Sequence, residues 1–299
     1  MAFHRAAEHT LPNAPIIIAS PTLRSGATLF QRLLSSSDNG ICYGEDAARR
    51  LLTLSEFAHN ESILLQQQED RQTHYWNKIL EGNLDFGLVD LELPGDFARH
   101  ALVGALTFFR QHYDEATKVI EKEIWACKIS KCSFLNVVKA ADFVSDLKCI
   151  YVYRNIVDTA MSQKSLGLIN DEQELAALCT EWVVNTDVIA ALSRKNFEQV
   201  PEMLLPIKFE DFLANGPKSV RQLESFTGMR GIKGDILKEK FNRWPQASDF
   251  DPTPILSYEK PVPLSETELN IVAHICGDRM REIYPEKHDE LSATSAAMH

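Results

Sequence analysis

Near the N-terminus, a short apolar run is followed by a loop and then by apolar residues at helical spacing, and few folds accommodate this order. Residues 15–19 read Pro-Ile-Ile-Ile-Ala, which is typical of a short buried strand in a parallel sheet. A loop over residues 20–26 leads into residues 27–34, where apolar side chains recur at helical spacing. A helix N-terminus presents free N–H groups and the positive end of the helix dipole. The order strand, loop, helix therefore predicts an anion-binding turn around Arg24, Ser25 and Gly26.

The same alternation of strand and helix patterns continues along the chain. We expect further strands at residues 124–128, 148–153 and 204–209, and helices at residues 134–144, 157–165, 172–192 and 217–227, while residues 266–284 close the fold. This order predicts an α/β fold in which a parallel β-sheet is flanked by helices on both faces.

One long stretch departs from this alternation. From residue 45 to residue 110 the apolar pattern is helical, with an interruption at residues 82–95. We interpret residues 45–120 as a helical insertion between sheet strands, a position where such folds often carry the elements that select a substrate. The sequence predicts one domain over residues 1–288 and a flexible tail over residues 289–299.

Composition and charge narrow the classes of function. The 299 residues include 42 acidic and 31 basic side chains, and the net charge of −11 argues against nucleic-acid binding. The six cysteines form no C-x-x-C pair and the histidines show no zinc spacing, so we expect no metal site. The N-terminal segment has no signal-peptide pattern, and no apolar run reaches the roughly 20 residues that cross a bilayer. We therefore expect a cytoplasmic protein with no membrane partner and with buried free thiols.

The loop has the side chains of an oxyanion site. Arg24 offers a fork of donors, Ser25 and Thr28 offer hydroxyls, and Gly26 allows close approach to the backbone. The ATP-binding pattern G-x-x-x-x-G-K-[ST] is absent, because Ala27 follows Gly26 and no lysine is in place. An ordinary turn with a capping serine is the alternative interpretation. If the loop binds a ligand, we expect a phosphate or sulfate group, but not that of a typical ATP site.

Three elements in this order resemble the PAPS-dependent sulfotransferases, where PAPS is 3′-phosphoadenosine 5′-phosphosulfate. Residues 24–28 are similar to the R/K-S-G-T-T loop that binds the 5′-phosphosulfate. Arg154 follows a strand and is itself followed after eight residues by Ser162, as in the element that binds the 3′-phosphate. Residues 209–211, Phe-Glu-Asp, precede Phe-Thr-Gly at 226–228, as in the third element. The resemblance covers residues 15–228 and implies a P-loop-like fold.

Within that family, the tyrosylprotein and carbohydrate-type enzymes look closest. Residues 42–46 read Cys-Tyr-Gly-Glu-Asp, which is similar to their C-G-E-E segment. Those enzymes normally carry a membrane anchor, and we expect this chain to be soluble. The resemblance implies transfer of a sulfuryl group from PAPS, without a metal, to a hydroxyl or amine of a small molecule, leaving PAP (3′-phosphoadenosine 5′-phosphate). The acceptor is expected to be a specialised metabolite, and the acidity of the chain suggests a cationic one. The alternatives are a P-loop kinase and a catalytically degenerate nucleotide-binding protein.

The resemblance also assigns roles to residues that would bind the cofactor. The 5′ end of PAPS would lie against Arg24, Ser25, Gly26, Ala27 and Thr28, and Ala27 replaces a threonine of the family pattern. The 3′-phosphate would bind Arg154 and Ser162, and Phe209 would stack on adenine. Ser257 and Lys260 would close over the nucleotide. Trp125 and Trp182 are other aromatic candidates for adenine, although tryptophans at strand and helix spacing more often belong to a core.

Catalysis needs a cation for the leaving oxygen and a base for the acceptor. Lys128 is similar to the lysine of the family's K-x-P segment, although the proline is missing and Lys131 is a second candidate. Arg24 would stabilise the charge on the sulfuryl oxygens. The general base is expected to be Glu45 or, next, Asp46, unless these acids only cap the helix that follows. A histidine base is an open alternative, with His100 and His112 as candidates.

Overall fold

Five short strands form one parallel sheet in the order β2-β3-β1-β4-β5. In this computed structural model, residues 15–85, 91–92, 95–194, 202–238 and 261–285 are described. The strands are β1 (Ile16–Ala19), β2 (Gly40–Tyr43), β3 (Ile124–Ile129), β4 (Lys148–Tyr153) and β5 (Leu204–Lys208). The predicted α/β fold is confirmed. Strand β2 was not expected from the sequence.

The central strand β1 is the point at which the strand order reverses. It pairs with β3 on one side and with β4 on the other, so that Ile18 lies between Lys128 and Ile150. In an open parallel sheet, such a switch point leaves a crevice at the carboxyl ends of the strands, where ligands bind. The loop after β1 begins at this position in the sheet.

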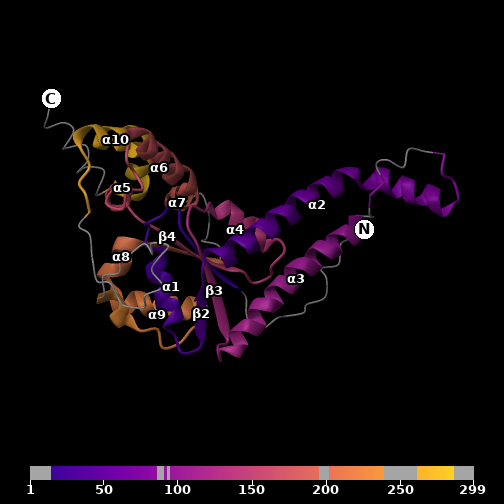
Figure 1. Cartoon of the computed structure of the whole chain (residues 1–299), viewed down its shortest axis with the longest axis horizontal. Coiled ribbons are helices and arrows are strands. Elements are labelled where there is room, and N and C mark those ends of the chain that lie inside the picture. Colours follow the sequence, from indigo (N-terminus) through magenta and orange to yellow (C-terminus); the bar gives the residue numbers. More distant parts are fainter. Residues whose placement is uncertain (1–14, 86–90, 93–94, 195–201, 239–260, 286–299) are drawn as a thin grey trace.

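The sheet has a helical layer on each face (Figure 1). Alternate residues of β1 enter different cores. Ile17 and Ala19 belong to the first core, whereas Ile16 and Ile18 belong to the second. The second core is covered by α1 (Ala27–Ser35), α8 (Phe209–Ala214), α9 (Gly216–Thr227) and the short 3-10 helix η2 (Gly234–Lys238). The remaining helices contribute to the first core: α2 (Glu45–Leu80), α3 (Gly95–Val119), α4 (Phe134–Ala141), α5 (Ile156–Lys164), α6 (Glu172–Asn185), α7 (Asp187–Ser193) and α10 (Glu266–Ile283).

Helices α2 and α3 form a long arm that projects from the sheet (Figure 1). They lie between β2 and β3 in the chain, where the sequence predicts a helical insertion. At 1.5 Å per residue, the 36 residues of α2 extend for about 54 Å. Its buried residues lie mainly in the first half, from Ala47 to Ala58, where the helix packs beside the sheet. Only the base of this arm is therefore fixed by the core.

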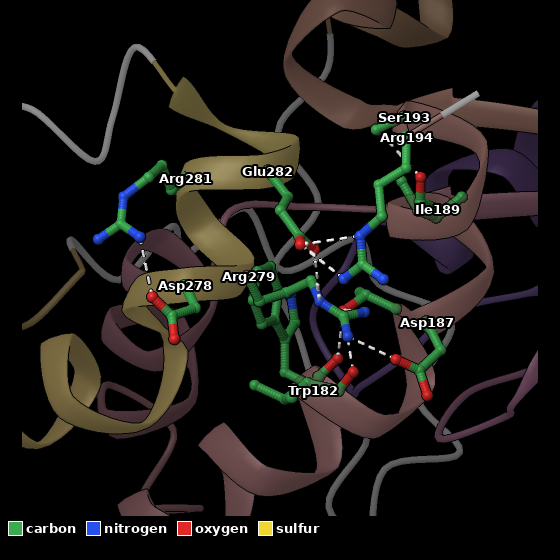
Figure 2. Close-up of polar contacts among 11 residues, drawn as sticks. Trp182, Asp187, Ile189, Ser193, Arg194, Asp278, Arg279, Arg281 and Glu282 are labelled. Carbon is green, nitrogen blue, oxygen red and sulfur yellow. Dashed lines mark hydrogen bonds and ion pairs between the residues drawn. The ribbon is translucent and has the colours of Figure 1, made fainter. Parts of the chain in front are cut away.

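The helix expected at residues 172–192 is divided into α6 and α7 at Thr186. Arg279 of α10 lies beside this break and donates hydrogen bonds to Thr186 and Asp187, while its Nε lies 3.4 Å from Glu282 Oε2 (Figure 2). Glu282 also accepts hydrogen bonds from Arg194 at the end of α7. These charged contacts fix α10 across the junction of α6 and α7.

Among the described residues, no single helix has both the length and the apolar character needed to cross a membrane. Taken together, α6 and α7 meet these criteria of length and apolar character, but the two helices are bent by 49° relative to each other.

Candidate functional site

The loop after β1 is held by hydrogen bonds from neighbouring elements. Gln163 of α5 donates to the carbonyl of Leu23 at 3.0 Å, and Asn185 of α6 donates to the carbonyl of Pro21 at 2.8 Å. Within the loop, the buried hydroxyls of Thr22 and Ser25 are 2.9 Å apart. The loop is therefore fixed before any ligand binds, which lowers the entropy cost of binding.

The N-terminus of α1 has no side-chain cap. Gly26 occupies the N-cap position with φ 102°, and no side chain there accepts a hydrogen bond from the first turn. The interpretation as a turn with a capping serine is therefore wrong. The first-turn N–H groups and the helix dipole make this end of α1 favourable for an anion.

Two arginines and an aromatic ring meet at the loop. Arg24 Nε donates to Ser162 Oγ at 3.1 Å, and Arg154 Nη1 donates to the Arg24 carbonyl at 3.3 Å. The Arg154 guanidinium carbon lies 5.2 Å from the centroid of the Phe209 ring, a cation–π distance. A Cβ atom on Gly26 would lie 2.3 Å from Phe209 Cδ2, so that only glycine fits against this ring. The structure thus joins three predicted elements that are far apart in the sequence.

Lys128 and Glu45 lie beside the first turn of α1. Lys128 Nζ is 3.4 Å from Thr28 Oγ1 and 3.2 Å from Glu45 Oε1. Ser130 Oγ donates to the same carboxylate oxygen at 3.1 Å. The side chain of Lys128 is 14% exposed and that of Glu45 is 32% exposed. A cation and a carboxylate are therefore adjacent beside the loop, and both have some access to solvent.

The second lysine has a different neighbour. Lys131 Nζ lies 3.3 Å from Glu181 Oε2 of α6, and its side chain is 55% exposed. Burial raises the pKa of the Glu181 carboxyl, and the charge of Lys131 lowers it in part. Lys128 contacts Thr28 in the first turn of α1, whereas Lys131 forms an ion pair with α6.

The other candidates for the general base are exposed residues of α2 and α3. Asp46 is 75% exposed and pairs with Arg49 on the surface of α2. His100 and His112 are exposed on α3.

The two tryptophans are core residues that donate hydrogen bonds. Trp125 is 1% exposed and donates to Asp114 Oδ1, whereas Trp182 is fully buried and donates to the Arg154 carbonyl. Ala27 is also buried, in the second core. Ser257 and Lys260 lie outside the described residues.

Sequence reasoning gave no role to three residues that contact this site. Ser130 follows β3 directly and bonds to Glu45, while Glu210 accepts a hydrogen bond from the backbone N–H of Asn155 at 3.0 Å. Tyr284 donates to the same Glu210 carboxylate at 3.0 Å. Only the position of Glu210 in the Phe-Glu-Asp segment could have drawn attention to it. The contact to Tyr284 spans 74 residues and has no local signal.

The cysteines close to the site remain protonated thiols. Burial raises the pKa of Cys42 well above its ordinary value, and it raises that of Cys132 to about 12. These thiols are therefore poor nucleophiles at neutral pH. Among the residues the structure describes, no group of three or more His, Cys, Asp or Glu is arranged to hold a metal ion.

Comparison with solved structures finds several sulfotransferases. A sulfotransferase domain from the curacin biosynthetic pathway is 16% identical, with 76% of this chain and 77% of that chain covered and a TM-score of 0.43. The sulfotransferase domain of the Synechococcus PCC 7002 olefin synthase is 18% identical, with 91% and 98% covered and a TM-score of 0.46. A sulfotransferase from Mycobacterium avium is 11% identical, with 90% and 76% covered and a TM-score of 0.43.

Comparison with protein families gives a match over most of the chain. No curated protein matches this sequence. The model of the sulfotransferase family matches residues 15–232, a span that runs from β1 through the loop, Lys128, Arg154 and Glu210. Because this match covers well over half of the sequence, the chain belongs to the sulfotransferase family.

Proposed function

We propose that this protein transfers a sulfuryl group from PAPS to a hydroxyl or amine of a small-molecule acceptor. One observation carries the proposal: Arg24, Lys128 and Arg154 gather around the uncapped N-terminus of α1, with the Glu45 carboxylate beside Lys128. This arrangement suits a ligand with two separate anionic groups and a reaction that moves one of them. The family match supports sulfuryl transfer in particular.

The residues present are suited to the two anionic ends of PAPS. Arg154 Nε is buried without a hydrogen-bond partner among the described residues, which is costly unless a ligand supplies an acceptor. With Ser162, it would bind the 3′-phosphate. The loop residues Arg24, Ser25 and Thr28, with the N–H groups of α1, would bind the 5′ end. Phe209 would contact the adenine.

Bound PAPS supplies an activated sulfuryl group, and the side chains supply charge and position. Lys128 would donate a hydrogen bond to the oxygen that keeps the electron pair when the sulfuryl group leaves. Its distance to Thr28 places it at the first turn of α1. Arg24 would neutralise charge on the sulfuryl oxygens. These cations are held in place before the reaction, which is the condition for strong electrostatic stabilisation.

Glu45 would accept the proton of the acceptor. Lys128 and Ser130 both contact its Oε1, and among the described residues no hydrogen bond uses its Oε2. An acceptor hydroxyl or amine that bonds to Oε2 would lie next to Lys128 and thus next to the transferred group. Proton transfer by a positioned carboxylate contributes about 10²–10⁴-fold to a rate.

We further propose that the acceptor is a cationic specialised metabolite. The net charge of −11 supports a cation, because positive side chains concentrated at the PAPS site leave a larger excess of acidic side chains in the rest of the chain. Acceptors matched in size but differing in charge test this point. If the neutral or anionic member reacts fastest, the acceptor is not selected for positive charge.

The test of the proposed function is a transfer assay with sulfur-labelled PAPS and a panel of alcohols and amines. We expect label in at least one acceptor in metal-free buffer, and a loss of about 10²-fold or more in Glu45→Gln. Turnover of ATP with Mg²⁺ in place of PAPS would indicate a kinase. Binding of PAP without transfer to any acceptor would indicate a degenerate nucleotide-binding protein.

A further inference from the structure

We propose that Glu210 is a positioning residue that fixes the backbone of Arg154. This inference rests on the proposed function, in which Arg154 binds the 3′-phosphate of PAPS. Among the described residues, Glu210 accepts hydrogen bonds from the Asn155 N–H and the Tyr284 hydroxyl, and not from the Arg154 guanidinium. It acts on the peptide bond between Arg154 and Asn155, the first two residues after β4.

That peptide bond is held from both sides. The N–H of Asn155 donates to Glu210 Oε1 at 3.0 Å, and the carbonyl of Arg154 accepts from the indole Nε1 of Trp182 at 2.9 Å. One bond comes from the start of α8 and the other from α6, so the two partners lie on different elements. A peptide whose N–H and C=O are both bonded to fixed side chains cannot rotate freely. The direction in which Arg154 leaves the strand is therefore set.

Glu210 is itself held at its second oxygen. Tyr284, directly after α10, donates its hydroxyl to Glu210 Oε2 at 3.0 Å and is 1% exposed. Burial and the neighbouring Glu210 carboxylate raise the pKa of Tyr284, so the phenol stays protonated and remains a donor. The ring of Tyr284 also makes a cation–π contact, because Lys208 Nζ lies 4.4 Å from its centroid. The carboxylate thus has both oxygens engaged by groups with little freedom to move.

The same turn of α8 also supports the guanidinium. Phe209, the residue before Glu210, lies under the Arg154 side chain at 5.2 Å and against Gly26 of the loop. The side chain and the backbone of Arg154 are therefore both placed by adjacent residues of one helix. Binding groups must be held within about 0.5 Å of the productive geometry, so a loosened peptide should weaken binding without removing the arginine.

The neighbouring acid provides a matched control. Asp211 follows Glu210 in α8 and has the same charge, but it is exposed. Asp211→Asn removes one negative charge near the site and leaves the held peptide intact. Glu210→Gln is the conservative variant, because its amide oxygen can accept from Asn155 and its amino group can donate to the Tyr284 hydroxyl. Tyr284→Phe removes only the bond to Glu210 Oε2.

The experiment is a double-mutant cycle on PAP affinity by calorimetry. We expect Glu210→Ala to raise the Kd about tenfold, while Glu210→Gln and Asp211→Asn stay within about threefold of wild type. Arg154→Ala raises the Kd further, and adding Glu210→Ala to it changes the Kd less than about twofold, because Glu210 acts through Arg154. In the transfer assay, Glu210→Ala raises the KM for PAPS and changes kcat little. Independent, additive effects of the two substitutions would overturn the proposal.

Hydrogen exchange separates this inference from the proposed function and needs no ligand. In wild type, we expect the Asn155 amide to be protected, and in Glu210→Ala and Tyr284→Phe we expect it to exchange faster. Asp211→Asn should leave it unchanged. If wild type does not bind PAP, the proposed function fails, and the amide exchange still decides whether Glu210 holds the peptide. Equal Asn155 exchange in wild type and in both variants would overturn the inference.

Discussion

The ring of Phe209 occupies the space where any side chain on Gly26 would lie. A Cβ atom at Gly26 would be 2.3 Å from Phe209 Cδ2, and the backbone φ of 102° is one that other residues rarely adopt. We predict that Gly26→Ala destabilises the fold by about 1–3 kcal/mol and weakens PAP binding at least tenfold, because the loop must move. Urea unfolding and calorimetry measure the two effects.

Gly104 is the control for that substitution. It lies on the exposed surface of α3, and a Cβ there would meet nothing within 4 Å. Gly104→Ala should stabilise the fold by up to about 1 kcal/mol and leave PAP affinity unchanged. If Gly26→Ala behaves in the same way, the close contact between Phe209 and Gly26 does not constrain the loop.

Substitution of the two lysines after β3 should have different effects. Lys128 contacts Thr28 and Glu45, whereas Lys131 pairs with Glu181. We predict that Lys128→Met lowers kcat by about 10²–10³-fold, the usual effect of removing one group that stabilises developing charge. Lys131→Met should change kcat less than about threefold. Steady-state kinetics with labelled PAPS checks this, and a larger loss in Lys131→Met would reverse the assignment.

The two acids at the start of α2 should also differ. Glu45 lies beside Lys128 and Ser130, but Asp46 is 75% exposed and pairs with Arg49. Glu45→Gln should lower kcat by about 10²–10⁴-fold with little change in PAP affinity, because a base acts on the acceptor. Asp46→Asn should keep most of the activity. Equal losses in the two variants would show that neither acid alone is the base.

Glu268 should make stability depend on pH. It accepts hydrogen bonds from Lys164 of α5 and from Ser265 at the start of α10. Partial burial opposes its ionisation, but these bonds outweigh burial, so its pKa lies below the ordinary value of 4.5. The carboxylate therefore stabilises the folded chain above that value, and the contribution is lost as pH falls through the lower folded-state pKa.

We expect Glu268→Gln to lower the free energy of unfolding by about 1 kcal/mol at neutral pH. The difference from wild type should shrink as pH falls below 4.5. Urea unfolding at a series of pH values measures it, with Glu266→Gln in the same helical turn as the control. A difference that stays constant down to about pH 3 would contradict this account of the ion pair.

Much of the fold follows from local patterns, and the exceptions have tertiary causes. Strand β4 was predicted with its observed bounds because its six residues, from Lys148 to Tyr153, form one unbroken run of β-forming character. Strand β2 has only four residues and begins with Gly40, a poor strand former. A Cβ at Gly40 would lie 2.6 Å from the Met229 sulfur, so the methionine side chain would have to shift, and the local sequence does not show this contact.

The candidate site was also predictable only in part, because local patterns indicate some of its residues and tertiary contacts determine the others. Residues within one segment, such as Arg24 and Gly26, follow from the strand–loop–helix order. The choice between Lys128 and Lys131 depends on where β3 ends and on the positive φ of 58° at Lys131, which is a property of the folded chain. The link from Glu210 to Tyr284 joins the start of α8 to the residue after α10, and no periodicity reports it.

Binding of PAPS by Arg154 can be tested by measuring the affinity for PAP of wild type and Arg154→Ala, with calorimetric titration in metal-free buffer. We predict micromolar binding by wild type and a loss of at least tenfold in the variant, because Arg154 would hold the 3′-phosphate. Thermal unfolding of both proteins shows whether the variant remains folded. Absence of PAP binding by wild type, together with binding of ATP and Mg²⁺, would contradict the proposed PAPS-dependent reaction.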